Sequence, residues 1–262
     1  MHYSEILRRI VKDIRIAVSF STVLPVGPAE RVGDGDLAGA TWALPLTGLL
    51  VGFAGAAVYW MASGAGLAGG PAAMLALLAT ILVTGAIHED GLADTADGLG
   101  GGRTRDRKLE IMRDSRIGTY GACALIASIG LRWTALAMIG KPGSVAAALS
   151  VSHAAARAAL AVFMWLVPTA RPDGLSAAAG RPPGQSVLIA FGLGVLCLAW
   201  DFGPGRTIAA VILLSLVGLI LARTVIRQLG GQTGDILGAF EQIGEIAIVL
   251  MAAALFRAEL RP

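Results

Sequence analysis

Residues 38–62 are AGATWALPLTGLLVGFAGAAVYWMA, a stretch without one charged side chain. A helix needs about 20 apolar residues to cross the hydrocarbon core of a bilayer, so this stretch is long enough to span it. The whole chain has the same character. Of its 262 residues, 55% are hydrophobic and only 15% are charged, and the mean hydropathy is +0.71. Because soluble chains carry about 25% charged residues, the sequence predicts an all-α, polytopic integral membrane protein.

About seven transmembrane helices are predicted, preceded by an N-terminal amphipathic helix. Residues 4–24 carry their charged side chains in the first half and turn apolar before Pro25, a pattern typical of a helix at the membrane surface. No internal repeat or low-complexity linker is visible, so one membrane domain over residues 1–262 is expected. The predicted spans are about 38–62, 70–88, 119–139, 145–167, 187–200, 207–222 and 243–256.

Basic residues predict the orientation, because cytoplasmic loops are enriched in Lys and Arg. With the N-terminus in the cytoplasm, fifteen of the 21 Lys and Arg residues fall on the inner side and four on the outer side. The inner loops are also the longer ones and carry most of the acidic residues. A location in the cell inner membrane, with an active site on the cytoplasmic face, is therefore expected. The net charge of +3 is too small to indicate nucleic-acid binding.

The segment most informative about chemistry is HEDGLADTADGLGGGR, residues 88–103. On a helix, Asp90, Asp94 and Asp97 fall at i, i+4 and i+7 and share one face. Like charges near lipid are costly unless a cation neutralises them, and carboxylates suit Mg²⁺ or Mn²⁺. The three Asp residues are predicted metal ligands, with a solvated helix end as the simpler alternative. Gly100 and Gly101 are expected to turn backbone N–H groups toward an anion.

Further candidate residues lie near the ends of, or inside, other predicted spans. Asp114 and Arg116 come just before the span at 119–139, where they could face the acidic segment and bind metal and phosphate. Arg157 is intramembrane, which indicates a functional site by default, although a structural salt bridge explains it equally well. Asp235, between glycines at a helix start, fits an anion-binding helix N-terminus or a simple N-cap. Glu245 lies deeper and is expected to contact a ligand or a partner group.

Three motifs resemble the cobalamin synthase family, also called adenosylcobinamide-GDP ribazoletransferases. They are HEDGLADTADGLGGG at 88–102, EIMRDSRIGTYG at 110–121 and GGQTGDILGA at 230–239. Two further elements, FSTVLP at 20–25 and ARPDGL at 170–175, extend the resemblance along the chain. Glu89 departs from the pattern, because the family is expected to have an apolar residue there.

The resemblance implies an activity. The 3′-hydroxyl of α-ribazole, or of its 5′-phosphate, would attack the cobinamide-linked phosphorus of adenosylcobinamide-GDP. GMP would leave, and adenosylcobalamin or its 5′-phosphate would form. Mg²⁺, or Mn²⁺, on Asp90, Asp94 and Asp97 would bridge the diphosphate, and Asp97 or Asp114 would take the hydroxyl proton. A homo-oligomer is compatible with this activity. The expected substrate contacts are Gly100, Gly101, Arg116, Arg157, Asp235 and Glu245.

Two other classes of protein fit parts of the pattern. A metal-dependent phosphotransferase of the CDP-alcohol type also uses membrane-embedded Asp clusters, but its usual Asp-Gly to Ala-Arg spacing is not reproduced. A cation-coupled transporter would place its acids near the bilayer midplane, between related halves. Here the acids gather on one side and no repeat is visible, which favours the ribazoletransferase.

Overall fold

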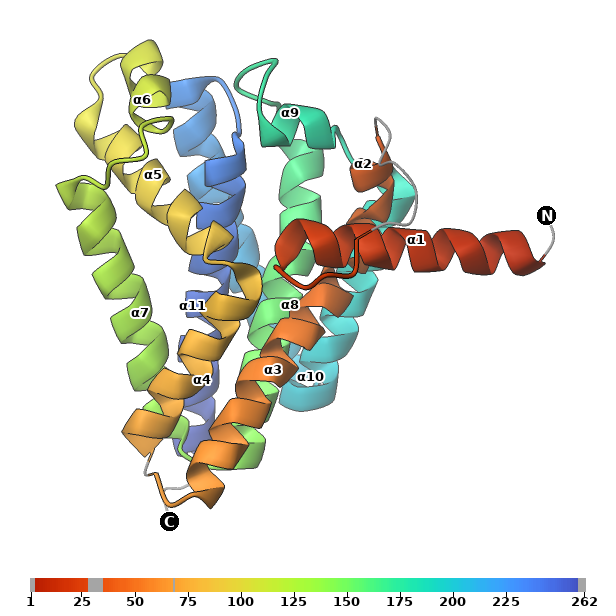
Figure 1. Cartoon of the computed structure of the whole chain (residues 1–262), viewed down its shortest axis with the longest axis vertical. Coiled ribbons are helices and arrows are strands. Elements are labelled where there is room, and N and C mark those ends of the chain that lie inside the picture. The colour runs from red at the N-terminus through yellow and green to blue at the C-terminus, as the bar shows by residue number, and fades with distance from the viewer. Residues whose placement is uncertain (1–2, 28–34, 68, 259–262) are drawn as a thin grey trace.

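The structure is a computed structural model that describes residues 3–27, 35–67 and 69–258. Arg31 and Arg261, which belong to the count of basic residues, lie outside this part of the chain. The described residues form a bundle of helices (Figure 1). The helices are α1 (Tyr3–Ser21), α2 (Asp36–Ala40), α3 (Leu44–Gly64), α4 (Gly69–Thr84), α5 (Ile87–Gly101), α6 (Arg105–Ile111), α7 (Thr119–Ile139), α8 (Pro142–Leu166), α9 (Leu175–Ala179), α10 (Gly184–Leu229) and α11 (Gly234–Ala258), with a short 3₁₀ turn at Thr41–Ala43.

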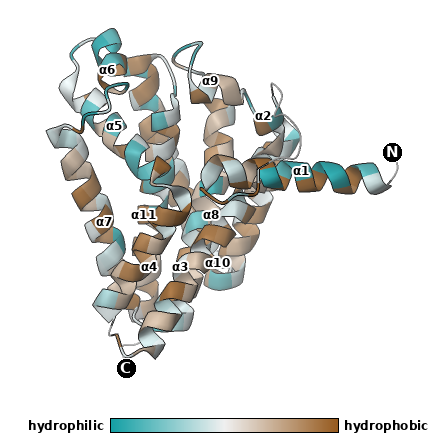
Figure 2. Ribbon diagram, in the orientation of Figure 1, coloured by the Kyte–Doolittle hydropathy of each residue, from teal (hydrophilic) through white to brown (hydrophobic). Residues whose placement is uncertain are grey.

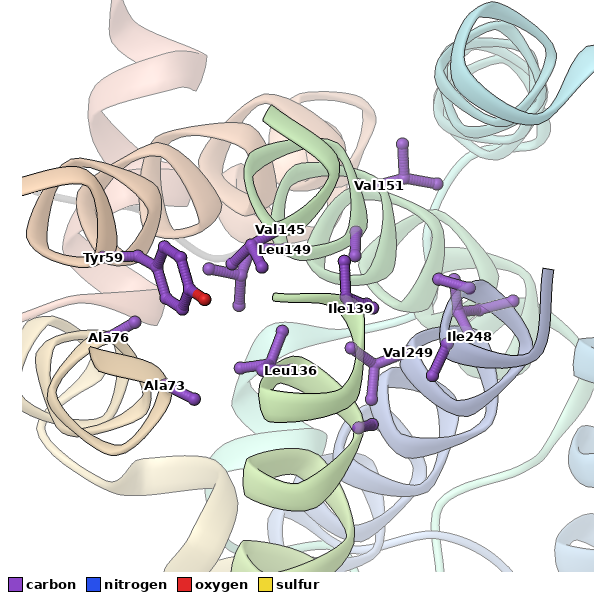
Figure 3. Packing of buried hydrophobic residues seen from close by; sticks show 14 of the residues in the cluster. Tyr59, Ala73, Ala76, Leu136, Ile139, Val145, Leu149, Val151, Ile248 and Val249 are labelled. Carbon is purple, nitrogen blue, oxygen red and sulfur yellow. The ribbon is translucent and has the colours of Figure 1, made fainter. Parts of the chain in front are cut away.

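Helix α8 lies at the centre of the bundle and packs against α3, α10 and α11. Glycines allow its close approach to α3. A Cβ at Gly48 would lie 2.4 Å from the His153 carbonyl oxygen, and one at Gly52 would lie 2.6 Å from the Ser150 Cα. Such small-residue contacts are the usual way in which helices associate in lipid. Figure 3 shows the apolar cluster beside this crossing, to which α3, α4, α7, α8 and α11 all contribute.

The all-helical, multi-pass architecture is confirmed. Within the described residues, five helices are long and apolar enough to cross a membrane, or six if α4 and α5 form one broken span. These two helices meet at an angle of 88°. Gly85 and Ala86, with φ of 63° and 58°, make the bend. The expected span at 70–88 therefore ends earlier, at Thr84, and the acidic segment forms its own helix.

Helix α10 decides the number of crossings. It has 46 residues, which would extend about 69 Å as one straight rod, about twice the hydrocarbon core of a bilayer. Gly203 breaks it, with φ of 74° and ψ of 169°, and Pro204 follows. Both ends of α10 lie at the same end of the bundle. Ser186, in its first turn, donates to the Gly39 carbonyl of α2, and the carbonyl of Leu229, its last residue, accepts from Arg105 of α6. Helices α2 and α6 both lie at the end opposite the α3–α4 turn (Figure 1).

The middle of α10 lies at the opposite end of the bundle, where the Phe202 ring meets Phe256 near the end of α11. The chain therefore reverses direction at Gly203. The predicted spans 187–200 and 207–222 correspond to the two halves of α10. The total of seven spans stays a prediction, because it requires both this reversal and a crossing by the bent pair α4–α5.

Helix α1 runs across the bundle rather than along it, and its N-terminal part extends beyond the other helices (Figure 1). Ile6, Leu7, Ile10 and Val11 are exposed, and polar and apolar residues alternate along the helix in Figure 2. Its C-terminal part is fastened to the bundle by the Trp42 indole, which donates to Asp13 at 2.8 Å. Helices α6 and α9 lie at the end of the bundle opposite the α3–α4 turn.

Candidate active site

Helices α5 and α11 are far apart in sequence, but they cross with their backbones in contact. The crossing lies toward the end of the bundle that carries α6 and α9 (Figure 1). The Cα atom of Gly91 lies close to Gly238, because a Cβ on Gly238 would be 3.3 Å from it. A Cβ on Gly91 would lie 2.8 Å from the carbonyl oxygen of Asp235. The lack of a side chain at Gly91 therefore makes room for α11. This crossing brings Asp90 and Asp235 together.

A pocket of about 110 Å³ opens beside the crossing. It is formed by the end of α1, by α5, α8 and α11, and by the loop before α9. Its polar side chains come from three different segments, which are His88 and Asp90 on α5, Arg171 in the loop and Asp235 on α11. Phe20 lines it as well. Binding sites for whole small molecules are usually about 300–1,000 Å³, so this pocket fits one group of a large substrate.

The acidic residues around the pocket follow the expected helical face. Asp90 is exposed and Asp94, one turn further along α5, is half-buried. The negative charges of Asp90, Asp235 and Asp97 all act on the Asp94 carboxylate. Asp235 therefore lies near the acidic residues of α5, while its contact with a ligand stays a prediction.

The N-cap of α11 is Thr233 and not Asp235. The Ile236 N–H donates to the Thr233 hydroxyl at 3.3 Å, and that hydroxyl donates to Asp235 at 3.1 Å. A Thr side chain that accepts from the third residue after it is the usual N-cap arrangement. The capping alternative for Asp235 is therefore wrong, and its carboxylate is free to face the pocket.

Two loops that flank the pocket are joined backbone to backbone. The Gln232 N–H donates to the Pro168 carbonyl at 2.8 Å, and the Ala170 N–H donates to the Gln232 carbonyl at 2.8 Å. Arg105 donates to the Ala170 carbonyl as well. Gly231, with φ of 157°, passes so close to Pro168 that a Cβ would lie 2.1 Å from its carbonyl oxygen. These contacts hold the residue after Ala170 beside the start of α11.

That residue is Arg171, a pocket residue that was not among the predicted site residues. Its side chain is 16% exposed, and its charge acts on Asp235. Its Nε lies 3.9 Å from Asp173, but its buried Nη1 has no hydrogen-bond partner. Leaving a buried donor unpaired costs about 1–3 kcal/mol. The motif ARPDGL contained Arg171, but only the folded loop shows that this residue lines the pocket.

Asp97 occupies a different environment from Asp90. It is 7% exposed, and its two carboxylate oxygens accept the N–H groups of Gly118 at 2.7 Å and Gly121 at 2.9 Å. These amides belong to the N-terminus of α7, whose partial positive charge favours a carboxylate. Asp97 therefore fastens α7 to α5. Its predicted roles as metal ligand and as proton acceptor stay predictions.

Asp114 and Arg116 pair with each other on the surface. Arg116 donates to Asp114 through Nη2 at 2.6 Å and through its backbone N–H at 3.1 Å. These hydrogen bonds lower the pKa of the exposed Asp114 carboxyl to about 2. Because an effective proton acceptor has a pKa nearer the working pH, this environment argues against Asp114 as the base.

Gly100 and Gly101 do not form a free loop. Both are in the last turn of α5, and the Gly102 N–H donates to the Gly98 carbonyl at 3.3 Å. The expected anion-binding turn is therefore wrong as a backbone conformation, and contact of these residues with substrate stays a prediction. The absence of a side chain at Gly100 makes room for the Tyr120 ring, since a Cβ would lie 2.7 Å from it.

Arg157 and Glu245 belong to a buried ionic network. It adjoins the pocket at His88, which lines the pocket and lies 3.6 Å from Glu241 of the network. Arg157 is 1% exposed and contacts Glu241 and Glu245, the latter at 3.2 Å. Arg132 bridges Glu245 at 3.2 Å and Glu89 at 3.0 Å. This pairing is the structural alternative for Arg157. It also explains the unusual Glu89, whose carboxylate is balanced by Arg132. Substrate contact by Arg157 and Glu245 stays a prediction.

Among the described residues, only His153, Glu241 and Glu245 bring three ligand atoms close enough to hold a metal ion. That position is already filled by a cation. Arg157 Nη1 lies 3.1 Å from His153 Nδ1, 3.2 Å from Glu245 and in contact with Glu241. We therefore interpret this cluster as an ion-pair network and not as a metal centre.

A larger cavity of about 470 Å³ lies between α8 and the two halves of α10. Its lining residues are apolar apart from Ser215, and none of them ionises. It offers no group for phosphoryl chemistry.

The fold and the pocket define a polytopic membrane protein with acidic and basic side chains gathered in a small pocket at one end of its bundle. The chain belongs to the cobalamin-5-phosphate synthase family, which matches residues 13–253.

Relatives with an assigned name cover nearly the whole chain. A protein of Bradyrhizobium diazoefficiens is 65% identical over 96% of each chain, and one of Mesorhizobium japonicum is 48% identical over 94% of each. One of Azorhizobium caulinodans is 44% identical over 92% of this chain and 95% of its own. All three are named adenosylcobinamide-GDP ribazoletransferase. No solved structure matches this chain.

Proposed function

We propose that this protein is an adenosylcobinamide-GDP ribazoletransferase that closes the nucleotide loop of cobalamin. The observation that carries the proposal is the 65% identity, over 96% of each chain, to a relative whose name states this activity. Its substrates are adenosylcobinamide-GDP and α-ribazole or α-ribazole 5′-phosphate. The pocket supports this activity because it combines carboxylates with a guanidinium, the groups that bind a metal-complexed diphosphate.

The reaction needs positioned charge more than covalent help from the protein. An oxygen of the ribazole ribose forms a bond to the phosphorus that carries cobinamide. The bond from that phosphorus to the oxygen bridging the two phosphates breaks, and this oxygen leaves with GMP. We assign the hydroxyl proton to Asp94, a half-buried carboxylate that lies among those of Asp90, Asp97 and Asp235.

Asp90 and Asp235, which both line the pocket, are the residues we propose to hold Mg²⁺ or Mn²⁺, with Asp94 beside them. The fit rests on the donor set. Mg²⁺ in proteins is usually bound through one or two carboxylates plus substrate phosphates, so a closed cage of three carboxylates is not required. When bound, the ion would neutralise the negative charge on the diphosphate and on departing GMP.

The basic loops near the pocket indicate which side of the membrane the pocket faces. The pocket lies where α6, α9 and the basic loops gather, and basic loops face the cytoplasm. We propose that the protein lies in the cell inner membrane with this pocket on the cytoplasmic side, within reach of water-soluble ribazole.

An assay of the purified protein tests the proposal. Adenosylcobinamide-GDP and α-ribazole should yield GMP and the cobalamin product in equal amounts with Mg²⁺, and activity should be lost with EDTA and return when Mg²⁺ is added back. Failure to form the cobalamin product with either Mg²⁺ or Mn²⁺ present would reject the proposed activity. Full activity in EDTA would reject only the metal.

A further inference from the structure

We propose that Arg171, which lines the pocket and has one guanidinium nitrogen, Nη1, without a hydrogen-bond partner, binds the diphosphate of the nucleotide substrate. This inference rests on the proposed function and adds a recognition residue to it.

The guanidinium of Arg171 has a hydrogen-bond donor that the neighbouring carboxylates do not pair with. Its ion pair to Asp173 is long, at 3.9 Å, and runs through Nε, while Nη1 is buried without a partner. A guanidinium has its N–H groups arranged as a fork that matches phosphate oxygens. A donor in this state, at the wall of a pocket, is prepared for an anionic ligand.

The surrounding groups indicate which anion. Asp90 and Asp235 share the pocket, and they would repel a bare anion but accept one that carries a divalent cation. Gly234 lines the pocket too, and its N–H is among the first four of α11, which have no acceptor within the helix. Helix N-termini favour phosphate groups. A metal-bound diphosphate therefore satisfies the arginine, the helix end and the carboxylates together.

The way in which Arg171 is held argues for recognition rather than chance. The residue before it is fixed by the bridge between Ala170 and Gln232 and by Arg105. The residue after the neighbouring proline, Asp173, is held by Arg113 at 2.5 Å. The loop is thus tied on both sides of Arg171, while the guanidinium itself is left with a free donor. Fixed geometry of this kind lowers the entropy cost of binding.

Substitution of Arg171 in the full-length protein tests the inference. Arg171→Gln should raise KM for adenosylcobinamide-GDP by about tenfold to a hundredfold, the usual value of a hydrogen bond to a charged group. KM for α-ribazole should stay within about twofold, well below the effect of one lost hydrogen bond. Arg171→Lys should give an intermediate value, because it keeps the charge but loses the fork. Arg181→Gln, which removes an exposed arginine that contacts Trp165, is the matched control and should behave as wild type.

Inhibition by product-like probes separates phosphate recognition from other effects. GDP should inhibit Arg171→Gln much more weakly than wild type, while guanosine, which has no phosphate, should inhibit both equally. An unchanged KM with unchanged GDP inhibition would overturn the inference. A parallel loss for GDP, guanosine and α-ribazole would overturn it too, since it would mean a structural role. If wild type itself forms no cobalamin product, the proposed function fails instead, and direct binding of GDP to wild type and to Arg171→Gln, measured by calorimetry, still tests Arg171.

Discussion

Three aspartates on one face of α5 have three different environments. Asp90 is exposed at the pocket, Asp94 is half-buried among other carboxylates, and Asp97 is buried beneath the start of α7. The spacing in the sequence placed them on one face correctly, because that depends only on the helical repeat. It could not show that two glycine amides from a later helix would occupy the third carboxylate. That contact joins residues 24 positions apart.

Asp97→Asn should therefore lower mainly the stability of the protein, and Asp90→Asn mainly its activity. An Asn at position 97 keeps one acceptor oxygen, so one of the two amides of α7 loses its partner and stability falls by roughly 1–3 kcal/mol. Thermal unfolding in detergent measures this. Asp90→Asn should leave the unfolding temperature nearly unchanged and remove most of the activity. The reverse pattern would show that Asp97 is the ligand and Asp90 the structural residue.

Asp235→Asn should reduce activity by at least about tenfold, or roughly 1.4 kcal/mol of transition-state stabilisation. The cap of α11 is supplied by Thr233, so the helix start does not depend on the charge at position 235. The product formed per minute at saturating substrate is the measurement. Thr233→Ala is the useful contrast, since it should lower stability by about 1 kcal/mol. Wild-type turnover by Asp235→Asn would confine the site to α5 and the Arg171 loop.

At the scale of elements, the site depends on the crossing of α5 and α11. Both motifs are visible in the sequence, but their glycines do not show which segment they approach. Composition cannot distinguish a glycine that admits a ligand from one that admits a neighbouring helix. The distinction needs the partner atoms, and for Gly91 these are backbone atoms of α11.

Gly91→Ala tests the crossing. The added methyl would lie 2.8 Å from the Asp235 carbonyl oxygen, so the helices must separate and Asp90 must move away from Asp235. We expect activity to fall at least about tenfold, because small displacements of positioned groups are costly to catalysis. Gly130→Ala, on α7, is the matched control, since its added methyl would have no heavy atom within 4 Å. Equal activity in the two variants would contradict the role given to the crossing.

At the scale of the whole molecule, the sequence predicted the class of fold and most helix positions. Span lengths and apolar composition follow from the bilayer, so they can be recognised in one chain. The extra bend at Gly85 and Ala86 could not be predicted, because Ala rarely adopts a positive φ and nothing local announces it. The loops beside the pocket also needed the structure, since Pro168 and Gln232 meet only after the bundle forms.

The reversal of α10 at Gly203 predicts where labels can react. In a cysteine-free variant, Thr104→Cys and Gln228→Cys should both react with a membrane-impermeant reagent from the cytoplasmic side. Gly205→Cys should react only from the other side, because it follows the turn at the far end of the bundle. Labelling of Thr104→Cys and Gln228→Cys from opposite sides would refute both the arrangement and a shared pocket.

The buried network has a consequence for how the protein is made. Arg157 and its partner Glu245 are 88 positions apart, and Arg132 and Glu245 are 113 apart. At about 5–20 residues per second, the ribosome delivers Glu245 roughly 4–18 seconds after Arg157. Until α11 is made, Arg157 enters the bilayer without its acidic partners Glu241 and Glu245, at a cost of about 2.5–3.5 kcal/mol, whereas Arg132 can already pair with Glu89. A nascent chain stopped before α11 thus keeps one uncompensated arginine, Arg157, in lipid and should be degraded by membrane proteases faster than the complete chain.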